Sequence, residues 1–147
     1  MEKAYKAMND ILVNLIHEVW ELEGKSIRAE GFKDLTNNDM HVIEAIGLGD
    51  GGNMSSIARK LNITVGSLTT AINGLVRKKY AERYRSEEDR RVVFVKLTEK
   101  GIAAYCQHED YHRKMIQAIL DRLEEEEVSV LLKTLGALKE FFAGYAT

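Results

Sequence analysis

The spacing of apolar residues predicts a mainly helical chain in which a β-hairpin interrupts the helices. In the first segment, apolar residues recur every three or four positions and so share one face of a long helix. They are Met8, Leu12, Leu15, Val19 and Leu22. Gly24 and Gly31 are expected to loosen this helix toward its end. A second, short helix is expected between the N-cap Thr36 and Gly47, and residues 47–52 form a glycine-rich loop.

Two short helical patterns joined by a tight turn follow this loop. Asn53 and Thr64 are the expected N-caps, and Asn62 with Ile63 makes the turn between the two helices. The inward face of the second helix is apolar and carries Val65, Leu68, Ile72, Leu75 and Val76. Two short amphipathic helices joined in this way are typical of a helix-turn-helix motif.

The pattern then changes from helical to alternating. Residues 81–85 and 92–97 are expected to form two strands, and the second of these, VVFVKL, is rich in β-branched residues. Residues 86–91, SEEDRR, make a charged hairpin tip. A helix is expected to start at Thr98, and a last helix begins within 124–127, where four carboxylates favour the positive end of the helix dipole.

Charge is distributed unevenly along the chain. The net charge of the 147 residues is −2, which by itself argues against nucleic acid. Residues 54–101, however, hold 11 Lys and Arg against 5 Asp and Glu, so this segment is strongly basic while the remainder is acidic. A basic block in an acidic chain is the electrostatic pattern of a DNA-contacting lobe. A solvated surface that is basic by chance is the alternative.

The second helix of the helix-turn-helix motif has an outward face of small, hydrogen-bonding residues, with an arginine near its end. They are Gly66, Ser67, Thr69, Thr70, Asn73 and Arg77. Such a face can enter the major groove of DNA and reach base edges and phosphates. A plain solvent-exposed face is the alternative, but such faces usually carry glutamate, which is absent from 64–81.

The hairpin tip adds Arg90 and Arg91 beside Asp89. An arginine on a protruding hairpin can insert into a narrow minor groove, where negative potential is concentrated. Asp89 would be repelled by phosphate, so we expect it to orient a neighbouring arginine through a charge-assisted hydrogen bond. The alternative is a tip whose charges only improve solubility.

Taken together, these motifs resemble a known family. The stretch SSIARKLNITVGSLTTAINGLVRKKYAERYRSEEDRRVVFVKLTEKG resembles the winged helix-turn-helix of MarR-family transcriptional regulators, and the resemblance covers essentially the whole chain. The D-x-R motif of that family's wing falls on Asp89 and Arg91. Lys79 departs from the family, which often has glycine there, and a left-handed lysine would cost about 1 kcal/mol.

The resemblance implies one MarR-type domain over 1–147. It places dimerisation helices in 1–30 and 98–147 and the winged helix-turn-helix lobe in 36–97. It also implies an obligate two-fold homodimer that binds a pseudo-palindromic operator in double-stranded DNA. A helical module that only dimerises is the competing interpretation, and the Ser- and Thr-rich outward face argues against it.

Within the family, three stretches resemble the fatty-acid-biosynthesis regulators of Gram-positive bacteria. They are FKDLTNNDMHVIEAIG, LTTAINGLVRKKY and ERYRSEEDRRVV. The resemblance implies a repressor whose DNA affinity rises when a long-chain acyl group on acyl carrier protein binds. An acyl chain needs an apolar cavity, for which Trp20, Met40 and Ile43 are the candidate lining residues.

The sequence HEDYH, residues 108–112, matches the H-E-x-x-H pattern of zinc peptidases. We reject a peptidase, because the pattern lies in an expected dimerisation helix rather than beside a substrate cleft. A regulatory zinc site is the stronger alternative, since Glu23, His41, His108 and His112 match the main metal site of zinc-sensing MarR regulators. On that interpretation the chain is a zinc-responsive repressor of metal-uptake genes. A buried polar network without metal, and with no cofactor required, is the other possibility.

The remaining features point to a cytoplasmic protein without membrane attachment. No apolar stretch is long enough to span a bilayer, and the N-terminus lacks the pattern of a signal peptide. The single cysteine, Cys106, excludes an intrachain disulfide and is expected to pack as a small apolar residue rather than act as a redox sensor.

Overall fold

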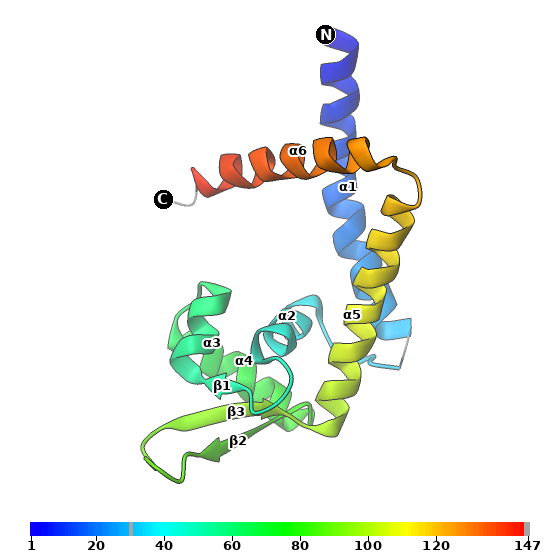
Figure 1. The fold of residues 1–147 in the computed structure, drawn as a ribbon. Coiled ribbons are helices and arrows are strands. Elements are labelled where there is room, and N and C mark those ends of the chain that lie inside the picture. The colour runs from blue at the N-terminus through cyan, green and yellow to red at the C-terminus, as the bar shows by residue number, and fades with distance from the viewer. Residues whose placement is uncertain (30, 146–147) are drawn as a thin grey trace. The chain divides into compact units, whose positions relative to one another are not determined.

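The computed structural model describes residues 1–29 and 31–145, and its element order confirms a mainly helical fold with a small antiparallel sheet (Figure 1). The elements are α1 (Glu2–Ala29), α2 (Asn37–Ile46), β1 (Gly52–Asn53), α3 (Met54–Leu61), α4 (Val65–Arg77), β2 (Ala81–Arg85), β3 (Val93–Leu97), α5 (Glu99–Leu120) and α6 (Glu125–Ala143). The chain forms two compact units, Met1–Glu109 and Asp110–Thr147, and the division falls within α5.

Three helices start where the sequence places an N-cap. The Thr36 hydroxyl accepts the backbone N–H of Asp39 at 3.1 Å, and the Asp39 carboxylate accepts that of Thr36 at 2.9 Å, which completes a capping box. Asn53 and Thr64 cap α3 and α4 by accepting backbone N–H groups at 2.8 and 3.1 Å. These caps satisfy amide groups that a helix leaves unpaired at its first turn, so the positions of the helices follow from local sequence.

Gly24 does not loosen the first helix, contrary to the expectation from sequence. The helix α1 continues to Ala29, and Gly24 is buried within it. A Cβ at this position would lie 2.5 Å from Oδ1 of Asn37, whose side-chain amide donates to the Trp20 carbonyl oxygen. The glycine therefore permits the start of α2 to approach α1 closely.

A third strand joins the expected hairpin, in a segment that the sequence assigns to a loop. The sheet has the order β1-β3-β2, and both pairings are antiparallel. Gly52 pairs with Val95 and Asn53 with Phe94, while β2 covers the other edge of β3 with Arg83 opposite Val95. The strand boundary at Val93 rather than 92 is a shift of one residue.

The hydrophobic core lies in the first unit, around α2, the inward face of α4 and the base of the sheet. Leu68, Ile72 and Leu75 are fully buried as expected, whereas Val65 is 46% exposed and so does not belong to the inward face. Tyr80 is also fully buried, and its hydroxyl donates to Oδ1 of Asp34 at 2.6 Å.

Lys79 adopts the left-handed conformation considered from the sequence, with φ 69°. This conformation turns the chain from α4 into β2 and brings the Tyr80 N–H to the Leu75 carbonyl at 2.9 Å. The Thr98 hydroxyl donates to the Lys79 carbonyl at 2.7 Å, so the start of α5 fixes the same turn.

The first and last helices of the chain, α1 and α6, both carry exposed apolar side chains. In α1 these include Ile11, Leu15 and Ile16, and in α6 they include Leu132, Leu135 and Phe141, all between 48% and 65% exposed. None of the described residues of α6 is buried. Among the helices described, none has the length and apolar character that crossing a membrane requires.

Candidate nucleic-acid interface

Helix α4 presents to solvent all six residues that the sequence assigns to a groove-facing surface. Gly66, Ser67, Thr69, Thr70, Asn73 and Arg77 are exposed, while the opposite face of the same helix fills the core. The absence of acidic side chains on this helix leaves its outward surface free of groups that phosphate would repel. The helix is thus anchored on one face and free to meet a ligand on the other.

The hydroxyl groups at the start of α4 have defined directions. Thr69 donates its hydroxyl proton to the Val65 carbonyl at 2.8 Å, and Thr64 donates to the hydroxyl oxygen of Ser67 at 3.0 Å. The Thr69 hydroxyl oxygen therefore keeps its lone pairs as acceptors for an approaching partner. Hydroxyl acceptors are suited to contact base edges in a major groove.

One residue of this surface is not predicted by the sequence pattern. Arg83 on β2 reaches across to α4 and donates from Nη2 to Oδ1 of Asn73 at 2.6 Å. Both side chains are exposed. The two residues lie on a helix and a strand, so no helical or strand periodicity relates them, and only the basic character of the segment points to Arg83.

The hairpin tip is ordered by its own side chains. Asp89 accepts the backbone N–H of Arg91 at 3.0 Å and the side-chain Nε and Nη2 of the same residue at 3.1 and 3.2 Å. The hydrogen bond from the Arg91 side chain, followed by that from its backbone, holds the pKa of Asp89 below its ordinary value. The expected contact between Asp89 and an arginine is therefore present, and the Arg91 side chain remains 91% exposed.

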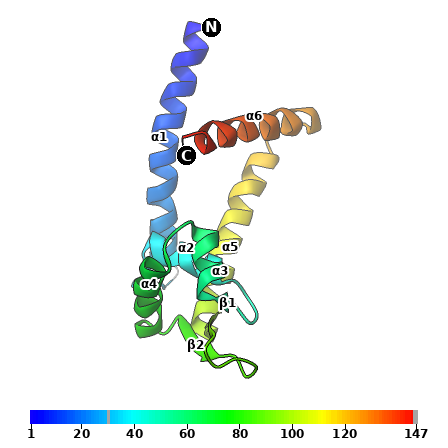
Figure 2. The ribbon, with the colours of Figure 1, turned by 90° about the vertical axis from the view of Figure 1, so that its left-hand side faces the viewer.

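The hairpin also carries Arg90, whose carbonyl oxygen accepts a hydrogen bond from Nη1 of Arg85 at 2.6 Å. This contact joins the tip to the end of β2 and leaves the exposed Arg90 side chain available to a partner. Figures 1 and 2 show the β2–β3 hairpin extending away from α3 and α4. An extended basic hairpin next to an exposed helix face provides two separate elements that can reach two grooves of a duplex.

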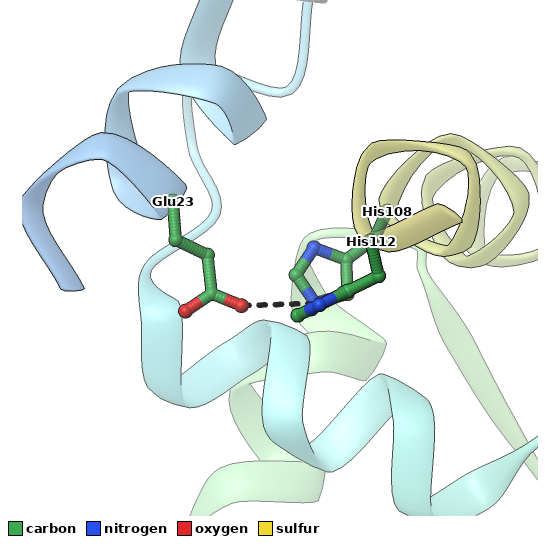
Figure 3. Close-up of side chains that lie close together, drawn as sticks. All are labelled: Glu23, His108 and His112. Atoms are coloured by element: carbon green, nitrogen blue, oxygen red, sulfur yellow. Dashed lines mark ion pairs between the residues drawn. The ribbon is translucent and has the colours of Figure 1, made fainter. Parts of the chain in front are cut away.

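A second cluster of titratable residues lies where α1, α2 and α5 meet in the first unit. His108 is only 2% exposed, and its Nε2 lies 3.2 Å from Oε1 of Glu23 and 2.9 Å from Oε1 of Glu44 (Figure 3 shows the contact with Glu23). His41 is linked to the same group through Oε2 of Glu44, at 3.5 Å. His112 follows His108 by one turn on α5.

Two of the four expected metal-binding residues, Glu23 and His108, are thus in direct contact, and His41 is connected to them through Glu44. Glu44 is a further member of this cluster that was not predicted, although its place three residues after His41 puts both on one side of a helix. Carboxylate oxygens and imidazole nitrogens are ligands that zinc accepts, so these residues have the chemistry to hold a divalent cation. They equally form a network of polar contacts without one.

The three residues expected to line an effector cavity lie in different surroundings. Met40 and Ile43 are fully buried in the core, and Trp20 is 52% exposed and stacks on the His41 ring at 5.6 Å. A cavity of about 480 Å³ lies nearby, against α2, α3 and α4. Its walls include Val42, Leu61 and Ala71, and Lys60 and Ser67 add polar groups. Its size is within the range of small-molecule sites.

Comparison with known proteins identifies relatives over most of the chain. The family model for the transcriptional regulators SarA and Rot matches residues 28–108. The crystal structure of FabT from Streptococcus pneumoniae in complex with DNA is 37% identical, covers 95% of this chain and 98% of that one, and has a TM-score of 0.86.

Two further relatives extend the likeness. The regulator PchR of Bacillus subtilis (strain 168) is 30% identical over 142 residues, which is 88% of this chain and 83% of PchR. The MepR–DNA complex of S. aureus is 25% identical, covers 89% of this chain and 96% of that one, and has a TM-score of 0.68. These relatives are transcriptional regulators and not enzymes, so HEDYH is not the mark of a peptidase here.

Proposed function

Since this chain belongs to the SarA/Rot family of transcriptional regulators, within the MarR-type winged-helix regulators, we propose that it is a repressor that inserts α4 into the major groove. The hairpin would place Arg91, and beside it Arg90, at the adjacent minor groove. One observation carries the proposal: the six small or hydrogen-bonding residues of α4 are all exposed, while Leu68, Ile72 and Leu75 on its opposite face are buried in the core. DNA-bound structures of the relatives FabT and MepR support DNA as the partner.

The working form of the repressor would be a homodimer. Its support is the exposed apolar surface of α1 and α6, because a monomer would leave these apolar side chains in contact with water, which is unfavourable. A two-fold dimer places its two α4 helices on half-sites about one helical turn, roughly 34 Å, apart. Light scattering at micromolar concentration tests the assembly, and a well-folded monomer bound to no DNA would contradict it.

The genes controlled would be those of fatty-acid biosynthesis, and long-chain acyl groups on acyl carrier protein would tighten operator binding. The support is the resemblance of three sequence segments to regulators of that pathway, together with the likeness to FabT. The apolar walls of the cavity beside α2, α3 and α4 offer one place where an acyl chain could be held. An effector acts on DNA affinity only if it binds the DNA-competent conformation more tightly than the others.

Sequencing of genomic DNA that is bound by the protein in cells tests this proposal. Operators upstream of fatty-acid-biosynthesis genes are the expected result. Titration of such an operator with long-chain acyl carrier protein should then raise affinity, whereas the carrier without an acyl chain should leave it unchanged. Enrichment of unrelated genes, or equal effects of the two carriers, would overturn the assignment of the pathway or of the effector.

A zinc-responsive repressor of metal-uptake genes is a second candidate, and the contacts of His108 favour it. A buried imidazole with carboxylate oxygens at 2.9 and 3.2 Å is an arrangement that a divalent cation would stabilise. The test is operator titration with zinc on the wild type, on His108→Ala and on a matched control, His17→Ala. His17 lies on α1 and is 75% exposed, so the same substitution there leaves the cluster intact.

The two candidates give different results in this titration. If zinc raises affinity tenfold, a coupling of about 1.4 kcal/mol, and only His108→Ala abolishes the effect, the cluster is the sensor. If zinc changes nothing in any of the three proteins while the acyl carrier protein tightens binding, the cluster is a polar network that joins α1, α2 and α5.

A further inference from the structure

The contact between Arg83 and Asn73 fixes how one residue of the groove-facing surface presents its hydrogen-bonding groups. Arg83 lies on the strand β2, opposite Val95 of β3, so the sheet holds its backbone in place. From there its Nη2 donates to Oδ1 of Asn73 on α4 at 2.6 Å.

An asparagine amide can ordinarily turn by half a rotation and present either its oxygen or its NH₂ group. A guanidinium has donors only, so an amide beside it must offer its oxygen. Because Arg83 holds Oδ1, the Asn73 amide cannot turn, and its NH₂ group keeps a fixed position. Asn73 therefore enters any complex with a defined donor.

We propose that Arg83 is a positioning residue that sets base specificity by making Asn73 a hydrogen-bond donor toward the major groove. The proposal rests on the function proposed above, in which α4 enters that groove. Guanine presents two adjacent acceptors there, O6 and N7, whereas cytosine presents the donor N4. A fixed NH₂ group therefore favours guanine over cytosine at the base that Asn73 faces. If the base pair is reversed, the NH₂ group meets the N4 donor of cytosine and is repelled.

Neighbouring contacts do not provide the same control. Arg85 lies on the same face of β2, because side chains alternate along a strand, but its Nη1 donates to the Arg90 carbonyl rather than to α4. Removing Arg85 takes away the same positive charge without releasing the Asn73 amide. This makes Arg85→Met a matched control for Arg83→Met.

The experiment selects binding sites from a randomised duplex DNA library at one fixed salt concentration, with the wild type and each variant. The wild type is expected to prefer guanine over cytosine by about tenfold at one symmetric pair of positions, which is the lower part of the range for a good base contact. Arg83→Met should reduce this preference to less than about threefold, because the amide can then turn. Arg85→Met should lower affinity at every site and leave the preference intact.

Two further variants separate a positioning role from a merely structural one. Arg83→Lys should keep most of the guanine preference, since an ammonium also has donors only. Asn73→Asp should shift the same position toward cytosine, because a carboxylate accepts from N4. Thermal unfolding of each variant shows whether a change in preference occurs in a folded protein.

The outcomes distinguish the inference from the function on which it rests. If Asn73→Ala leaves the selected sequence unchanged, α4 does not read bases at this residue, and both the groove assignment of Asn73 and the inference fail. If Asn73→Ala removes the preference at one position while Arg83→Met retains it in full, the interface stands and the positioning role of Arg83 is wrong.

Discussion

Adding one methyl group at two glycines of this protein should change its stability in opposite directions. Gly101 lies on α5 in its first turns and is buried. A Cβ there would lie 2.0 Å from the Tyr80 carbonyl oxygen and 3.2 Å from Cβ of Leu97. The Tyr80 oxygen cannot withdraw easily, because it accepts the Thr98 N–H at 3.1 Å and belongs to a fully buried residue.

The magnitude follows from two competing terms. Alanine is favoured over glycine inside a helix by roughly 0.5–1 kcal/mol, but forcing an extra carbon into a packed site costs about 1–3 kcal/mol or more. The contact at Gly101 is with backbone, so the overpacking cost is expected at its upper end, and after the helix gain is subtracted Gly101→Ala should lower the free energy of unfolding by about 2 kcal/mol. At Gly74 on α4, the nearest atom to an added Cβ outside the local helix backbone is the flexible Nη2 of Arg77, 3.9 Å away. Gly74→Ala should therefore raise stability by roughly 0.5–1 kcal/mol.

Urea unfolding of both variants and the wild type, without DNA and at one protein concentration, measures these differences. The concentration must be fixed because association would itself change the apparent stability. The midpoint should fall for Gly101→Ala and rise for Gly74→Ala, with similar slopes for all three proteins. A Gly101→Ala protein as stable as the wild type would refute the argument, since it would show that α5 can move away from Tyr80 at no cost.

Three other predictions concern ionisation, DNA contact and assembly. The hydrogen bond from Tyr80 is the largest cause that lowers the pKa of Asp34. This bond to the ionised carboxylate therefore stabilises the fold fully at pH values above the ordinary pKa of an aspartate, and the stabilisation is lost as the pH falls through the lowered pKa. Tyr80→Phe should thus reduce the free energy of unfolding at neutral pH and make that free energy fall less steeply as the solution is acidified. Urea unfolding between pH 2 and pH 7 measures both effects. An acid profile identical to that of the wild type would contradict this. Arg91→Ala should weaken operator binding by about 1–3 kcal/mol at fixed salt with the melting temperature unchanged, and Asp89→Asn should weaken it less, because the arginine loses its orientation and not its charge. Leu135→Glu, on a residue 51% exposed in α6, should convert the dimer to monomer in light scattering, and a dimer of undiminished affinity would show that this part of α6 lies outside the interface.

Local signals in the sequence were sufficient to place most of the helices. Thr36, Asn53 and Thr64 each satisfy backbone groups within three residues of themselves, so their effect does not depend on the rest of the fold. The Asp89–Arg91 contact is local in the same sense and was also predicted. The left-handed turn at Lys79 could be considered in advance because the family often has glycine there, and the structure adopts it.

Features that depend on distant segments could not be predicted in this way. The two-residue strand β1 exists only through its pairing with β3, more than forty positions later in the chain. The role of Gly24 depends on the approach of Asn37, and the link between Arg83 and Asn73 depends on how the sheet meets α4. Apolar periodicity likewise does not separate residues that line a cavity from residues that fill the core, which is where Met40 and Ile43 lie.

The order of the three-stranded sheet has a consequence for the protein's behaviour at high concentration. The segment VFVKL of β3 is the most aggregation-prone strand by composition, and an exposed edge on it would invite pairing with other copies. In this sheet β3 is central: β2 pairs with it along its whole length on one edge, and β1 pairs with Phe94 and Val95 on the other, so neither edge is open over its full length. The outer strands make poor templates for growth, because β1 has only two residues and β2 carries Glu82, Arg83 and Arg85. The sheet that carries this exposed basic hairpin therefore offers no long apolar edge to a second copy of the chain.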